Sequence, residues 1–150
     1  MASANRPFRA VAFYDPAGKH PFPVGRDFSE SVGYPAHILD ALPAATVNAF
    51  VGVSNVSIFA EISKGSTVLD IGCGSGLDSL IAAGKAGPSG RVIGVDFSES
   101  MLRKARGAAE VAGVEMEFHC CDASQTPLED GSIDVILVNG IFNLNPKREK

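Results

Sequence analysis

Two carboxylates and three glycines stand where the chain could bind a small polar ligand. The stretch VLDIGCGSG contains Gly72, Gly74 and Gly76, and Asp70 stands two residues before the first of them. Glycines at such spacing let a backbone turn tightly and approach a ligand closely. Asp96 follows the last glycine at about the twenty-residue spacing from which a carboxylate can bind ribose hydroxyls. The pattern therefore predicts a site for a ligand that contains a nucleoside.

The same stretch distinguishes between cofactor classes. A dinucleotide site has the motif G-x-G-x-x-G, in which alanine can replace the last glycine. If the motif begins at Gly72, its last position is Leu77, and if it begins at Gly74, its last position is Ser79. Neither residue is glycine or alanine. Asp70 near the turn repels a pyrophosphate and attracts a cation. S-adenosylmethionine has an ammonium group, a ribose and a base but no phosphate, so the residues favour it over NAD. The alternative interpretation is an oxidoreductase that binds an NAD-type dinucleotide. A scaffold that binds neither ligand is the third interpretation.

Alternating strands and helices must position these residues. Apolar, β-branched runs predict strands over residues 67–71, 91–97, 116–123 and 132–140. Helical spacing and capping residues predict helices over residues 77–87 and 98–113. This alternation predicts an α/β fold with a mostly parallel sheet and helices on both faces. Ligands bind such sheets at the carboxyl ends of strands, where Asp96, Asp122 and Asn139 stand.

The N-terminal part has a different composition. Four prolines and two glycines within residues 1 to about 30 predict an irregular arm. Short helices are predicted over residues 35–42 and 56–62, after Pro35 and after a possible cap at Ser54-Asn55. We therefore divide the chain into an N-terminal arm with cap helices, residues 1–64, and a ligand-binding domain, residues 65–150.

Composition limits the partners. The chain has 150 residues, 45% of them hydrophobic, which suffices for one core, and a formal charge of −4 without a basic block that would bind nucleic acid. Its three cysteines form no CxxC pattern, so neither a disulfide framework nor a metal site is predicted. No apolar run approaches the roughly 18 residues of a membrane span or forms a signal peptide. We expect a cytoplasmic protein that does not bind membranes.

Four motifs in order, VLDIGCGSG, VIGVDFSESML, CDAS and VILVNG, resemble the class I S-adenosylmethionine-dependent methyltransferases over residues 66–150. The resemblance implies a Rossmann-like sheet of strand order 3-2-1-4 and direct in-line transfer of the methyl group. It implies that the glycine loop, with Cys73 in it, carries the methionine part of the cofactor and that Asp70 orders this loop. No catalytic residue is implied.

Further roles follow from the same resemblance. Asp96 would hold the ribose hydroxyls, and Phe97 and Met101 would flank the adenine. Asp122 and the backbone of Ala123 would read the adenine edge. The backbone around Asn139 would face the methionyl ammonium.

A closer similarity is to the arsenite methyltransferase branch, through GYPAHILDALP, GPSGRVIGVDFSESML and NLNPKREK. The thiolates that bind arsenic in that branch would fall near Val53 and at Gly140, and neither residue is cysteine. Because As(III) is a soft ion that needs thiolates, we expect a small-molecule methyl acceptor other than arsenite.

The class continues beyond the fourth strand, whereas this chain ends at Lys150. We therefore expect the C-terminal strands to be missing and strand four to be an apolar edge that exposes Ile136 and Val138. Such an edge recruits further strands, so a homodimer is expected. A cofactor-binding fragment without activity of its own is a further alternative.

Overall fold

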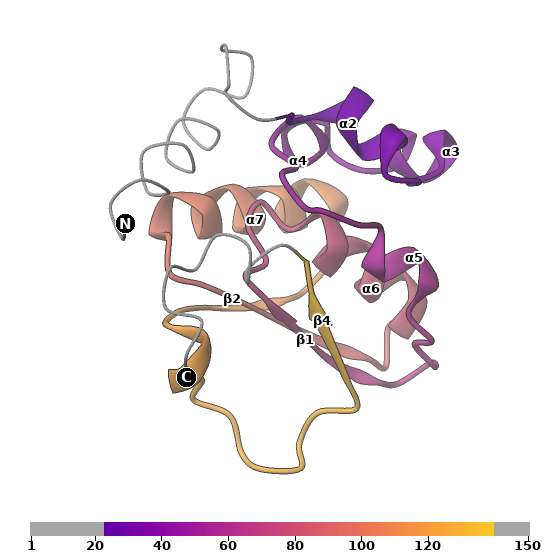
Figure 1. Ribbon diagram of the computed structural model, residues 1–150. Helices are drawn as coiled ribbons and strands as arrows, with labels where there is room; N and C mark the ends of the chain where they lie inside the picture. The colour runs from indigo at the N-terminus through magenta and orange to yellow at the C-terminus, as the bar shows by residue number, and fades with distance from the viewer. Residues whose placement is uncertain (1–22, 140–150) are drawn as a thin grey trace.

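A parallel four-stranded sheet forms the centre of the computed structural model, which describes residues 23–139 (Figure 1). The strands are β1 (Thr67–Ile71), β2 (Arg91–Asp96), β3 (Glu117–Cys120) and β4 (Val135–Val138). Their order is β3-β2-β1-β4, and each neighbouring pair is parallel. The predicted fold class and strand order are thereby confirmed. The expectations for residues 1–22 and 140–150 lie outside the described residues.

Two helices connect the first three strands. They are α6 (Leu77–Ala86) and α7 (Glu99–Ala112). Ser98 caps α7 by accepting a hydrogen bond from the backbone N–H of Met101 at 3.4 Å. Gly113 ends α7 in the left-handed conformation with φ of 67°. Both ends of α7 are therefore where the capping residues predicted them.

The two faces of the sheet are covered differently. One face packs against α6, through Val68, Val92, Leu137 and Ala82. The sequence predicted helices on both faces, but among the described residues the other face packs against the connection between β3 and β4. This connection contributes side chains at 121, 128 and 133, and it passes below the sheet in Figure 1. It contains only a short 3-10 helix, Ala123–Gln125, because Pro127 and Gly131 interrupt its sequence.

Four short helices form a cap before the sheet. They are α2 (Arg26–Ser31), α3 (Ala36–Asp40), α4 (Ala44–Asn48) and α5 (Val56–Phe59). The prediction of an irregular chain to about residue 30 is wrong for α2, which begins after Gly25, beyond the last proline of the arm. Helix α4 was not predicted, and α5 ends three residues before the expected position. Asn55 stands at the N-cap of α5 but makes no side-chain capping bond.

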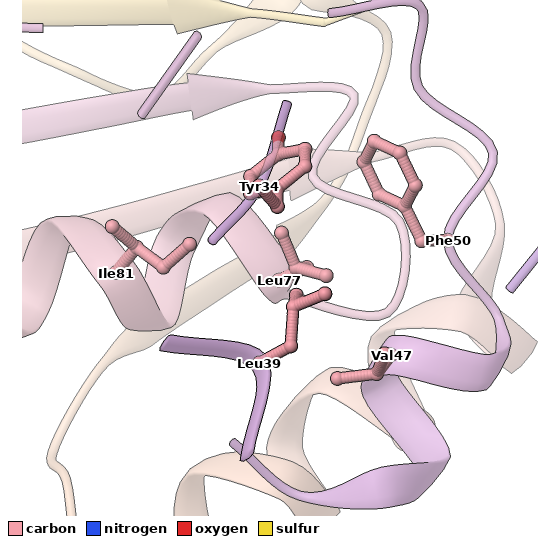
Figure 2. Close-up of a cluster of buried hydrophobic side chains, with 6 residues drawn as sticks. All are labelled: Tyr34, Leu39, Val47, Phe50, Leu77 and Ile81. Carbon is pink, nitrogen blue, oxygen red and sulfur yellow. The ribbon is translucent and has the colours of Figure 1, made fainter. Parts of the chain in front are cut away.

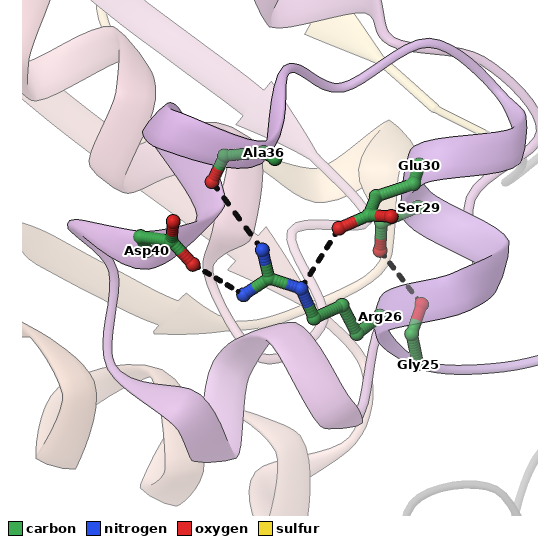
Figure 3. Close-up of polar contacts among 6 residues, drawn as sticks. All are labelled: Gly25, Arg26, Ser29, Glu30, Ala36 and Asp40. Atoms are coloured by element: carbon green, nitrogen blue, oxygen red, sulfur yellow. Dashed lines mark hydrogen bonds and ion pairs between the residues drawn. The ribbon is translucent and has the colours of Figure 1, made fainter.

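An exposed arginine connects the first two cap helices (Figure 3). The Arg26 guanidinium contacts the Glu30 carboxylate at 2.8 Å within α2 and the Asp40 carboxylate at 2.7 Å in α3. It also donates to the Ala36 carbonyl at 3.4 Å. These contacts orient α2 and α3 relative to each other.

The cap and the sheet domain share one core (Figure 2). Side chains of the cap pack against the buried face of α6, and the cluster consists of Tyr34, Leu39, Val47, Phe50, Leu77 and Ile81. The rings of Tyr34 and Phe50 meet edge to face with their centroids 5.1 Å apart. Burial of these apolar groups holds the cap on the domain that carries the glycine loop. No helix within residues 23–139 is long and apolar enough to cross a membrane.

Candidate functional site

The carboxyl ends of the four strands bring the predicted residues to one edge of the sheet. Along this edge, Asp122 follows β3, Asp96 ends β2, the glycine loop follows β1 and Asn139 follows β4. An elongated ligand along the edge would therefore meet carboxylate, backbone and amide groups in succession. This is the arrangement that open α/β sheets use for ligand binding.

The glycine loop is a tight turn fixed to β2. Its Gly72 and Cys73 N–H groups both donate to the Val95 carbonyl, at 2.8 and 3.0 Å. Gly74 has a φ of 55°, and a Cβ there would lie 3.4 Å from the Met101 Cε. A side chain at this position would be strained and crowded, so the loop depends on glycine there.

Cys73 is buried inside the loop. A Cβ on Gly94 of β2 would lie 2.9 Å from its sulfur, so the thiol packs directly against that strand. Its side chain fills the space between the loop and β2.

Asp96 holds two backbone segments together. Its carboxylate accepts hydrogen bonds from the N–H groups of Gly74 at 3.0 Å and of Ser98 at 2.9 Å. The residue therefore joins the glycine loop to the first turn of α7. A ligand hydroxyl bound here would share the carboxylate with these two amides.

Asp70 lies on β1, beneath the loop, and is completely buried. It accepts a hydrogen bond from the Ser79 hydroxyl at 2.6 Å. Burial raises the pKa of this carboxyl to about 8, with further contributions from the negative charges of Asp78 and Asp96. Asp70 therefore differs chemically from an exposed aspartate.

The residues predicted to contact the adenine differ in their exposure to solvent. Phe97 is 55% exposed at the end of β2, whereas Met101 is buried against Val24 and Val51. Asp122 is exposed and caps the 3-10 helix that begins at Ala123, accepting from the N–H and the hydroxyl of Ser124 at 2.9 and 2.7 Å. Met101 is thus the member of the set least open to a ligand, and Asp122 already has a structural role as a cap.

A buried polar network at Asp78 was not predicted. An aspartate in the first turn of a helix, as Asp78 is in α6, is expected to stabilise the helix dipole. In the structure its carboxylate accepts hydrogen bonds from the Tyr34 hydroxyl at 2.5 Å, from Asn139 Nδ2 at 2.8 Å and from the Ser57 hydroxyl. Burial, and secondly the Asp78 charge, raise the pKa of the Tyr34 phenol. Asp78 therefore joins the cap to the sheet domain.

Asn139 extends this network to the loop between α4 and α5. Its Oδ1 accepts from the backbone N–H groups of Val53 at 2.8 Å and Ser54 at 3.1 Å, and its Nδ2 donates to the Ser54 carbonyl at 2.6 Å. A Cβ on Gly52 would lie 2.5 Å from Nδ2, so only glycine fits there. The family resemblance had implied a role only for the backbone around Asn139, not for its side chain.

No local signal could have revealed this network. Asn139 and Asp78 are 61 residues apart, and Tyr34 and Asp78 are 44 residues apart. The one available sign was a carboxylate on the apolar helix α6, next to Leu77. Val53, at a predicted thiolate position, is exposed, while Gly140 lies outside the described residues.

A hollow of about 850 Å³ lies between the start of α2, α4 and α7. Lys104 and Val111 of α7 form one wall, and Val24 and Pro43 belong to the other. None of the predicted site residues lines it, so its size alone does not make it the functional site.

The family model and the two relatives described here are all methyltransferases. A family model described as a methyltransferase domain matches residues 62–150. The arsenite methyltransferase of Halobacterium salinarum is 36% identical over 123 residues, which are 81% of this chain and 31% of that protein. The demethylmenaquinone methyltransferase of Lactococcus lactis is 41% identical over 75 residues, 49% of this chain and 30% of that protein. This chain thus spans about a third of the length of these relatives.

A solved methyltransferase structure is also similar to this chain. The crystal structure of an arsenic(III) S-adenosylmethionine methyltransferase from Chlamydomonas reinhardtii superposes with a TM-score of 0.58 at 26% identity. The match covers 85% of this chain and 42% of that one. The matched share of this chain is larger than the sheet domain, so the match includes the cap region as well as the sheet.

Proposed function

The chain belongs to the class I S-adenosylmethionine-dependent methyltransferases, and from this membership we propose that it binds S-adenosylmethionine at the carboxyl edge of its sheet for methyl transfer to a small organic acceptor. The observation that carries the proposal is the glycine loop between two buried carboxylates, Asp70 and Asp96, the second of which holds the Gly74 amide. This arrangement suits a ligand with a ribose and a cationic end. It is unsuited to a pyrophosphate, because the stretch Asp70–Gly76 contains no lysine or arginine to neutralise its charge.

Each part of the cofactor has a proposed position. The methionine part would lie on the loop of Gly72, Cys73, Gly74 and Gly76, with its ammonium toward Asp70 and the backbone of Asn139. The ribose hydroxyls would donate to Asp96. The adenine would lie by Phe97, Met101, Asp122 and Ala123. The exposed ring of Phe97 and the order of the strand ends support this direction along the edge.

The residues of this chain would act by positioning. Bound S-adenosylmethionine supplies an activated methyl group, so transfer needs alignment with the acceptor and exclusion of water. The glycine loop, fixed to β2 by two hydrogen bonds to Val95, provides a rigid support. We assign no residue of this chain to proton removal from the acceptor.

The acceptor is proposed to be a small organic molecule. The loop tied to Asn139 presents the exposed side chain of Val53, which is apolar and cannot coordinate As(III). Gly140 likewise carries no thiol. We therefore propose that arsenite, named as the substrate of a relative, is not methylated by this chain.

Calorimetric titration tests the cofactor proposal. S-adenosylhomocysteine should bind with one-to-one stoichiometry, whereas NAD should give no saturable heat. Binding of NAD without S-adenosylhomocysteine would instead favour the oxidoreductase alternative. Transfer of labelled methyl groups to candidate organic acceptors, with arsenite in parallel, tests the acceptor. Methylated arsenic would contradict the proposed acceptor class, and cofactor binding without any transfer would favour a binding fragment.

Three further proposals concern the setting of this activity. We propose a cytoplasmic location, because the cysteine pattern suits a reducing compartment. We also propose that residues 1–64 act as a cap on a cofactor-binding domain at residues 65–150. Finally, the exposed Ile136 on the edge strand β4 supports self-association of this chain as a homodimer.

A further inference from the structure

Three carboxylates are buried around the glycine loop. Asp70 on β1, Asp78 on α6 and Asp96 on β2 are each at most 6% exposed. An ionised carboxylate loses solvation when it is buried, and neighbouring negative charges repel one another. A cluster of this kind therefore tends to retain a proton on one of its members.

The hydrogen bonds distinguish the three carboxylates. Asp96 accepts from two backbone amides, and Asp78 accepts from three side chains. Among the residues that the structure describes, Asp70 accepts hydrogen bonds from Ser79 alone, through its hydroxyl and its backbone N–H. Because donors stabilise a negative charge and Asp70 is enclosed beside two other carboxylates with donors from one residue only, its ionised form has the least support of the three.

The described neighbours of Asp70 do not stabilise its ionised form. Its register partners are Gly94 on β2 and Leu137 on β4, and neither can be charged. The titratable groups that face it are Asp78 from α6, Asp96 from β2 and the phenol of Tyr34 from the cap. The strand β4, with the sequence VILV, contributes no titratable side chain.

We propose that Asp70 carries a proton in the cofactor-free protein and releases it to solvent when the ammonium group of the cofactor binds. The inference rests on the proposed function, because it assumes that the methionine end of the cofactor approaches this loop. The O–H bond of the Asp70 carboxyl breaks, the proton passes to a buffer base, and no other bond changes. The arriving ammonium replaces the proton as the neutralising positive charge.

Proton release is measurable independently of activity. Titration with S-adenosylhomocysteine at pH 6.5 in buffers of different ionisation enthalpy gives the number of protons released per molecule bound. The only cation of this ligand is its α-ammonium group, which is already protonated at that pH because an α-amino group has a pKa of about 7.7–8.0. We expect close to one proton to be released by the wild-type protein.

Two variants identify the source of the proton. Asp70→Asn keeps the size of the side chain and its bond to Ser79 but cannot ionise, so it should bind the ligand with no proton release. Glu110→Gln is the matched control, because it removes an exposed carboxylate on α7 far from the loop, and it should release as many protons as the wild type. Release that persists in Asp70→Asn, or enthalpies independent of buffer in the wild type, would overturn the inference.

The pH dependence of affinity provides a second measurement should Asp70→Asn fail to fold or to bind. Wild-type affinity for S-adenosylhomocysteine should increase about tenfold per pH unit between pH 5.5 and 6.5, because one proton is lost on binding. A flat affinity would refute proton release while leaving cofactor binding intact. Complete absence of binding at every pH would instead contradict the proposed function.

Discussion

Asp96 combines a structural contact with the proposed ribose contact, so its removal should affect binding in two ways. In Asp96→Ala the Gly74 and Ser98 amides lose their acceptor, and the cofactor loses its hydroxyl contacts. Hydrogen bonds to charged groups are worth about 1.5–3 kcal/mol, so we expect affinity for S-adenosylhomocysteine to fall by about ten- to a hundredfold. Isothermal titration measures this loss.

The control for Asp96 is Asp122→Ala. Asp122 is exposed and bonded to Ser124, so its loss should weaken binding less than the loss of Asp96. Equal affinities of Asp96→Ala and wild type would remove Asp96 from the proposed site.

Asp70 should make the cofactor-free protein less stable as the pH rises. Folding raises its pKa from 3.8 to about 8, so between these values the folded state binds more protons than the unfolded state. The free energy of unfolding therefore falls as the pH rises through this window, and the contribution of the proton is fully present only below it. Thermal unfolding between pH 5 and 8 should show a decline in Tm that is smaller in Asp70→Asn. Parallel declines in the two proteins would contradict this assignment.

Local spacing predicted the positions of these residues better than their contacts. The tight glycine loop and the position of Asp96 at the end of β2 were predictable because both follow from local spacing. The burial of Met101 and the bonds of Asp78 were not, since they depend on the cap folding over the loop from more than 20 residues away. An aspartate at the start of a helix has the same local sequence pattern whether its side chain is exposed to solvent or hydrogen-bonded to a tyrosine.

Among the elements, the loop between α4 and α5 depends most on one side chain. Asn139→Ala removes the acceptor for the Val53 and Ser54 amides and one donor to Asp78. The Val53 amide is exposed, so the main loss is the donor to the buried Asp78 carboxylate, which costs about 1–3 kcal/mol, and the free energy of unfolding in urea should fall by about that amount. Hydrogen exchange at the Val53 and Ser54 amides should accelerate more than exchange in β1.

Asn48→Ala provides the comparison for this change. Asn48 is an exposed residue of α4, so its truncation should alter stability by less than about 0.5 kcal/mol. Unchanged protection at Val53 in Asn139→Ala would show that the loop is held by other contacts.

Elements marked by an apolar run or by a capping residue or proline at their start were predictable, whereas α2 and α4 were not. The strands and α7 follow from apolar runs and capping residues that act locally. The helices α2 and α4 have only six and five residues and are too short to show a period in the sequence. They form because Phe28 of α2 and Val47 of α4 pack in the apolar core shared with α6, which is a tertiary effect.

At the scale of the whole molecule, the described edge of the sheet should promote association. Ile136 is 58% exposed on β4, the last strand of the order β3-β2-β1-β4, whereas Val138 is partly buried. We expect light scattering of the 150-residue chain at micromolar concentration to report a dimer. Ile136→Lys should shift the mass toward the monomer, because a charge on an edge strand opposes pairing. A wild-type chain that remains monomeric would contradict the homodimer proposal.

The bond between Asn139 and Asp78 also sets an order of events during synthesis on the ribosome. Asn139 is made 61 residues after Asp78, a delay of roughly 3 to 12 s at about 5–20 residues per second. During this interval Asp78 can meet Tyr34 and Ser57, but the loop around Val53 lacks its amide partner. The loop between α4 and α5 can therefore reach its final hydrogen bonding only after β4 has been made, although the apolar side chains of the cap can pack against α6 earlier.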